Sequence, residues 1–143
     1  MPSPTPPHRP HWPRVLGAIL IAQVMLIAGA VAWVAIYSYL IAPGQSIAAY
    51  QAHAQVSGPW VSLVLGIPVF FGLGRWLARH RPEAARASAI ALGVGYVVVD
   101  LAILLAAAQG EIPWGMVAAN YVVKLSAAWF GAMSATQRSS TSR

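Results

Sequence analysis

Residues 15–42 form a long apolar run without a charged side chain, in which Gln23 is the only strongly polar residue. A helix of about 20 apolar residues crosses the hydrocarbon core of a bilayer, so this run can span a membrane even if it is tilted. A cleaved signal peptide is the alternative, because Arg9 and Arg14 precede the run and Ala30-Val31-Ala32 resembles a cleavage site. The apolar core of a signal peptide usually has about 7–15 residues, and this run is longer. We therefore expect an uncleaved membrane anchor.

The composition of the whole chain agrees with a membrane location. Only 8% of its 143 residues are charged, 58% are hydrophobic, and the mean hydropathy is +0.62. A soluble domain normally carries about 25% charged residues, so this chain has too few to cover a surface that faces water. The net charge of +6 does not indicate nucleic-acid binding, because most basic residues lie in short segments beside apolar runs. The absence of cysteine excludes disulfides and thiolate sites.

The sequence predicts an all-α integral membrane protein with four transmembrane helices in an antiparallel bundle. The spans are expected at about residues 15–42, 59–78, 88–108 and 113–135. They form one membrane domain at 14–135, since the length leaves no room for a sizeable soluble module. The tail at 1–13, with six prolines, and the Ser/Thr-rich tail at 136–143 are predicted to be disordered.

Proline and glycine mark the expected ends of the spans. Pro43-Gly44 ends the first helix, and the mixed polar and apolar residues at 45–58 predict a short helix at the membrane interface. Ser57 is the expected N-cap of the second span, with Pro59 in its first turn. Residues 109–112 are expected to form a tight turn between the third and fourth spans.

Basic residues are distributed unequally between the two ends of the predicted bundle. Eight of the nine Lys and Arg residues fall on the side that carries both termini, whereas the connections at 43–58 and 109–112 contain none. The positive-inside rule assigns the basic side to the cytoplasm. We therefore expect a multi-pass protein of the cell inner (plasma) membrane with both termini in the cytoplasm.

Arg75 lies near the end of the second span and belongs to the basic segment there, whereas two charged residues, Asp100 and Lys124, remain deep inside the predicted spans. At the helical rise per residue, Asp100 lies about 12 Å from the end of its span and Lys124 about 15 Å from the start of its own. Because a tight turn joins these spans, the two side chains are expected at nearly the same depth. A lone charge at the bilayer centre costs about 2.5–3.5 kcal/mol or more. We therefore expect the two side chains to pair.

Further polar residues share helical faces with this pair. Tyr96 lies four residues before Asp100, and Asn120 lies four residues before Lys124. These four residues predict one intramembrane polar cluster, with Gln23 of the first span as an additional candidate. The functional interpretation is a proton or ion pathway or a site for a polar ligand, because ionisable residues in membranes commonly serve function. The structural interpretation is a neutralised pair that fixes the register of the third and fourth helices.

Other polar residues give weaker indications of a site. His53 and Glu111 lie in the two outer connections, but one His and one Glu are too few ligands for a metal, so we expect His53 to be an exposed loop residue. His8 and His11 lie in the proline-rich tail and are expected to be solvated. The basic segment 75–86 is flanked by spans and is expected to meet anionic lipid headgroups rather than nucleic acid.

These observations favour a non-catalytic accessory or scaffold component of the membrane, with no cofactor and no metal. Its expected partners are bilayer lipids and either a second copy or another membrane protein. The alternative is a small carrier or a proton- or ion-conducting unit that uses Asp100 and Lys124. A water-filled path from the polar cluster to either surface would favour the carrier, and a dry, closed pair would favour the scaffold. No motif is specific enough to assign a family.

Overall fold

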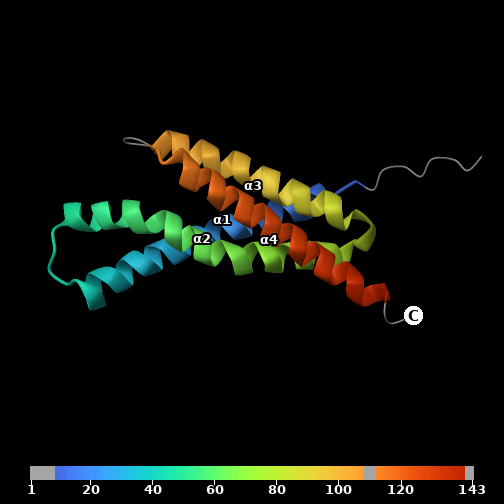
Figure 1. Cartoon of the computed structure of the whole chain (residues 1–143), viewed down its shortest axis with the longest axis horizontal. Helices are drawn as coiled ribbons and strands as arrows, with labels where there is room; N and C mark the ends of the chain where they lie inside the picture. Colours follow the sequence, from blue (N-terminus) through green and yellow to red (C-terminus); the bar gives the residue numbers. More distant parts are fainter. Residues whose placement is uncertain (1–8, 108–111, 141–143) are drawn as a thin grey trace, which may run out of the picture.

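The computed structural model describes residues 9–107 and 112–140, which are almost entirely helical (Figure 1). A helix bonds its own backbone N–H and C=O groups, which is the condition that lipid imposes on a spanning segment. The elements in chain order are α1 (Trp12–Ile36), the π-helical turn η1 (Tyr37–Ile41), α2 (Ile47–His80), the 3₁₀ turn η2 (Pro82–Ala84), α3 (Ala85–Ala107) and α4 (Trp114–Ser140). No strand occurs in the described ranges, so the predicted all-α class is confirmed there.

Three helical segments of the described chain are long and apolar enough to cross a membrane. These segments are Trp12–Ile41, Ile47–His80 and Pro82–Ala106. Helix α4 is also long, but it is not among them, because polar residues such as Asn120, Tyr121 and Lys124 lower its hydropathy. The membrane character of the chain is therefore supported by three helices, and the fourth span stays a prediction.

Helix α2 begins much earlier than the sequence predicted. Ser46 is its N-cap and accepts a hydrogen bond from the Ala49 N–H at 3.2 Å, so the separate interfacial helix and the start at Ser57 are both wrong. The Ser57 hydroxyl instead donates to the His53 carbonyl at 2.8 Å, within a continuous helix. Pro59 removes only one backbone donor, and Gly58 before it has no Cβ to clash with the proline ring. The uninterrupted helix is about 51 Å long, which exceeds the hydrocarbon thickness of a bilayer.

The ends of the other helices lie close to the predicted spans, but the tails differ. Helix α4 continues to Ser140, so the part of the predicted C-terminal tail at 136–140 is helical. Trp12 and Pro13 belong to the first turn of α1, where proline is favoured because its missing N–H has no helical partner to lose. Residues 1–8 and 141–143 of the predicted tails lie outside the described residues, as do residues 109–111 of the predicted turn at 109–112.

The first helical segment ends as the sequence predicted. η1 stops at Ile41, and Gly44 adopts a φ of 81°, a left-handed conformation that suits glycine. The Tyr50 hydroxyl, from the first turn of α2, donates to the Ala42 carbonyl at 2.9 Å and so ties the two helices together across this connection.

Helices α2 and α4 form the most extensive helix pair, and two glycines let their backbones approach closely. A Cβ atom on Gly74 of α2 would overlap the backbone of Ala128 of α4, and one on Gly131 of α4 would overlap the backbone of Phe71 of α2. Small residues at helix contacts are typical of membrane proteins, in which packing rather than hydrophobic burial drives association. This contact positions α4, the most polar helix, against α2 (Figure 1).

The core is built of alanine and a few large side chains, whereas the outside carries many large apolar residues. The core cluster draws on all four long helices: Val15, Ala18, Ile19, Ala22, Leu26, Phe70, Leu77, Leu92, Tyr96, Ala127 and Ala128. Leu20, Val24, Val98 and Phe130 are all more than 60% exposed. Such an apolar exterior suits lipid, because in water patches of this extent are rare on monomeric proteins.

Candidate functional site

Tyr96 of α3 lies between the two charged groups that the sequence places inside the predicted spans, Asp100 and Lys124. Its hydroxyl donates a hydrogen bond to Oδ1 of Asp100 at 2.9 Å and accepts one from Nζ of Lys124 at 3.1 Å. The charged groups themselves do not approach within 4.0 Å, so the direct contact expected from the sequence is not made. The hydroxyl can replace it because a phenol both donates and accepts, and so satisfies the carboxylate and the ammonium together.

Two further side chains complete this polar network, which we define as Ser62, Tyr96, Asp100, Tyr121 and Lys124. The Tyr121 hydroxyl donates to Oδ2 of Asp100 at 2.9 Å, and Lys124 Nζ donates to the Ser62 hydroxyl at 2.8 Å. Sequence reasoning missed the role of both. Tyr121 lies three residues before Lys124 and shares its helical face, a spacing that would have identified it.

The side chains of the polar network differ in how deeply they are buried. Tyr96 is 1% exposed and Lys124 is 2% exposed, whereas Asp100 is only half-buried. The aliphatic stem of Lys124 packs against Gly66 of α2, where a Cβ would lie 2.8 Å from Cε. Its Nζ also lies 4.8 Å from the centroid of the Tyr96 ring, a cation–π distance. Lys124, which belongs to α4, is therefore held by contacts with α2 and α3.

Asn120, the fourth predicted cluster residue, does not hydrogen-bond to the other three. Its Nδ2 donates to the Pro59 carbonyl of α2 at 2.9 Å, and its Oδ1 is buried without a partner. It lines a cavity of about 160 Å³ together with Ser62, Asp100, Tyr121 and Lys124. Water occupies about 30 Å³ per molecule, so this volume suits a few waters or one small polar molecule. The cavity is the part of the site where chemistry with a ligand or a proton could take place.

Gln23 of α1, the additional candidate, makes no hydrogen bond to the network, and its Oε1 is buried without a partner. His53 also differs from the prediction, because it lies in helix α2 and is half-buried rather than exposed in a loop. Its ring stacks on Tyr37 with centroids 3.5 Å apart and planes at 5°. Glu111, its proposed neighbour, lies outside the described residues. Within the described ranges no three His, Asp or Glu side chains are grouped to hold a metal ion.

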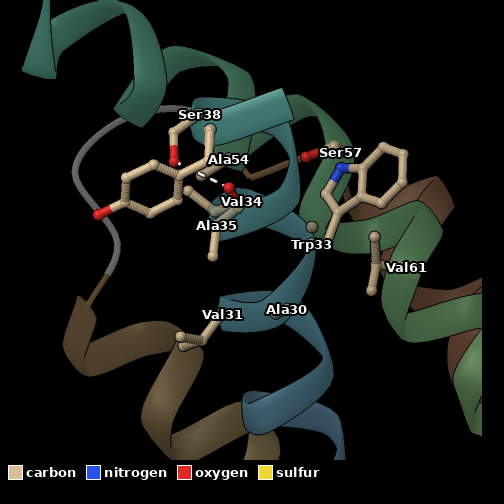
Figure 2. A pocket seen from close by; sticks show the side chains of 11 residues that line it. Ala30, Val31, Trp33, Val34, Ala35, Ser38, Ala54, Ser57 and Val61 are labelled. Carbon is tan, nitrogen blue, oxygen red and sulfur yellow. Dashed lines mark hydrogen bonds between the residues drawn. The ribbon is translucent and has the colours of Figure 1, made fainter. Parts of the chain in front are cut away.

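A second and larger hollow lies between α1 and the first half of α2. Its volume is about 470 Å³, and Figure 2 shows the Trp33 side chain reaching from α1 toward Ser57 and Val61 of α2. The lining is mostly aliphatic, and the Ser38 hydroxyl bonds its own helix at the Ala35 carbonyl. Nε1 of Trp33 is buried without a hydrogen-bond partner. The residues that line this hollow include no charged side chain.

Comparison of the chain with protein-family models, with curated proteins and with solved structures gives no match. Function therefore has to be inferred from the chemistry of these side chains. The polar network has hydrogen-bond donors and acceptors, one carboxylate and one ammonium, and a small cavity beside them. These groups can hold helices in register, bind a small polar molecule, or exchange a proton.

Proposed function

We propose that the chain crosses the plasma membrane four times as an antiparallel bundle, with both termini in the cytoplasm. Three apolar helices support the spans, and the unequal distribution of Lys and Arg supports the orientation. Helix α4 has 27 residues, about 40 Å of helix, which is long enough to cross the core. Its polar residues Asn120, Tyr121 and Lys124 find partners on α2 and α3, so insertion of α4 beside these helices costs less than insertion alone.

Within this topology, the best-supported role is that of a non-catalytic accessory or scaffold component. The observation that carries it is the chain of hydrogen bonds from Ser62 through Lys124, Tyr96 and Asp100 to Tyr121. These hydrogen bonds connect α2, α3 and α4, and the two charged groups, Asp100 and Lys124, each have at least two hydrogen-bond partners. A network satisfied in this way specifies one arrangement of the helices, because any shift in register would leave a charge without a partner in a low-dielectric interior.

Reconstitution of the full chain into liposomes that enclose a pH-sensitive dye tests this role. A scaffold should leave an imposed proton gradient to decay at the rate seen in empty liposomes. The scaffold role would be contradicted if the gradient decayed faster in liposomes with the wild type than in empty liposomes, and if Lys124→Met restored the rate of empty liposomes. Purification from native membranes should also recover the chain with a stoichiometric membrane partner or as a homo-oligomer.

The second candidate function is a small carrier or a proton- or ion-conducting unit. The cavity beside the network favours it, because Oδ1 of Asn120 and the half-buried carboxylate of Asp100 both belong to residues that line that cavity. An unpartnered buried acceptor is unusual and is commonly satisfied by water or a ligand. Under this alternative, the gradient decays faster than in empty liposomes, and Asp100→Asn and Lys124→Met each abolish the effect.

A further inference from the structure

A small hollow at the basic end of the bundle brings together residues from three helical elements. His11 and Arg14 come from the start of α1, Leu77 and His80 from the end of α2, Arg81 from the residue after α2, and Ser88 from the first turns of α3. Leu77 and Ser88 are buried and form its floor, being 5% and 4% exposed. The other four residues are exposed and form its rim. We call this feature the basic hollow.

The charges around the basic hollow are not neutralised within the described chain. The guanidinium groups of Arg14 and Arg81 make no hydrogen bond or ion pair with a described residue. Arg75 differs, because it donates to the Ser134 hydroxyl at 3.2 Å. Glu83 is the one described carboxylate at this end, and it does not line the hollow. Two arginines on one rim without a counter-charge favour the binding of an anion.

The size of the basic hollow limits how an anion can enter it. Its volume is about 10 Å³, close to the smallest space that holds one water. One oxygen atom of an anion therefore fits, and the rest must lie outside, among the rim residues. The Ser88 hydroxyl on the floor makes no hydrogen bond with a described residue, although the side chain is more than nine-tenths buried. Because Ser88 lines the hollow, its unused donor can serve an oxygen that enters.

The position of the hollow in the bilayer selects the class of anion. It lies where α1 begins, α2 ends and α3 begins, and exposed Trp12 and Trp76 belong to the same end. Tryptophan is enriched at the headgroup level of membranes. We propose that the basic hollow binds the phosphate group of an anionic phospholipid, with Arg14 and Arg81 on its oxygens and Ser88 donating from the floor. This inference rests on the proposed transmembrane topology.

Lipid binding to the full chain in detergent tests this inference, measured by native mass spectrometry at graded concentrations of phosphatidylglycerol. The variant Arg14→Gln with Arg81→Gln removes the two rim charges. The matched control, Arg79→Gln with Arg86→Gln, removes two exposed arginines of the same end that do not line the hollow. We expect the rim variant to weaken binding at least about tenfold, since hydrogen bonds to charged groups are the strong ones, and the control about twofold or less. Ser88→Ala should weaken binding by a smaller factor.

Three results would overturn the inference. Equal losses in the rim and control variants would show general attraction to a basic surface. Equal affinity for phosphatidylcholine would show that the net negative charge of the lipid does not matter. Saturation by inorganic phosphate without a response to phosphatidylglycerol would assign the hollow to a soluble phosphate. The topology is measured separately by cysteine labelling, so a wild-type protein that shows the expected labelling but does not bind phosphatidylglycerol would remove only this inference.

Discussion

Removal of one charge from the polar network should destabilise the protein more than removal of both. Lys124→Met deletes the ammonium and its bonds to Ser62 and Tyr96, and it leaves Asp100 without a counter-charge. Breaking a buried pair in this way typically costs about 3–5 kcal/mol. Asp100 is half-buried and keeps both tyrosine donors, so we expect a loss near the lower limit, about 3 kcal/mol.

Asp100→Asn should cost more, because the charge that it leaves behind is less exposed to water. Lys124 is 2% exposed and would keep only neutral partners, so a loss of about 5 kcal/mol is expected. The double variant Asp100→Asn with Lys124→Met leaves no charge, and the asparagine still accepts from a tyrosine. It should lose only about 1–2 kcal/mol, the cost of imperfectly paired hydroxyls.

The assay is equilibrium unfolding of the full chain in mixed micelles by a denaturing detergent, followed by circular dichroism. Val122→Met is the control, because Val122 is 62% exposed on the same helix and its replacement should change stability by about 0.5 kcal/mol at most. The reasoning is refuted if either single variant is as stable as the wild type. It is refuted equally if the double variant loses the sum of the two single losses, since the charges would then be independent.

Three other predictions concern single contacts. Tyr96→Phe removes the hydroxyl between Asp100 and Lys124 and should cost about 2–3 kcal/mol in the same assay, whereas an unchanged stability would show that the bridge is not formed. Gly74→Val should prevent the close approach of α2 to α4 and greatly reduce the yield of folded protein, while Gly72→Val, at an open position, should be tolerated; equal yields would contradict the packing. Ser46→Ala should cost about 1 kcal/mol and speed amide hydrogen exchange in the first turn of α2, and unchanged exchange would show that α2 is not capped there.

Long apolar runs predicted the positions of α1 and α3 well, because a span needs only length and apolar composition. The start of α2 was missed since Ser57 and Pro59 match the pattern of a helix beginning, and only the alternative cap at Ser46 shows that the helix is already formed. The tails were missed in part because polarity was taken to end α4, although polar residues continue a helix readily.

The sequence predicted which residues of the candidate site share a helical face, but it did not predict which side chains contact one another. Periodicity placed Tyr96 with Asp100 and Asn120 with Lys124, since four residues make about one helical turn. It could not show that Tyr96 would lie between the charges, because this depends on side-chain rotamers and on the distance between α3 and α4. The partners from α2, Ser62 and Pro59, were not predicted, because nothing in the sequence says which helix packs against α4.

Cysteine accessibility in intact cells tests the proposed four-span topology most directly, because the chain has no native cysteine. Four single variants would be treated with a membrane-impermeant maleimide: Gln51→Cys, Glu83→Cys, Gly110→Cys and Gln137→Cys. The account predicts labelling from outside at positions 51 and 110, and labelling at 83 and 137 only after the membrane is permeabilised. Labelling of Gln137→Cys from outside, with Glu83→Cys still protected, would show that α4 does not cross as proposed and would contradict the four-span account.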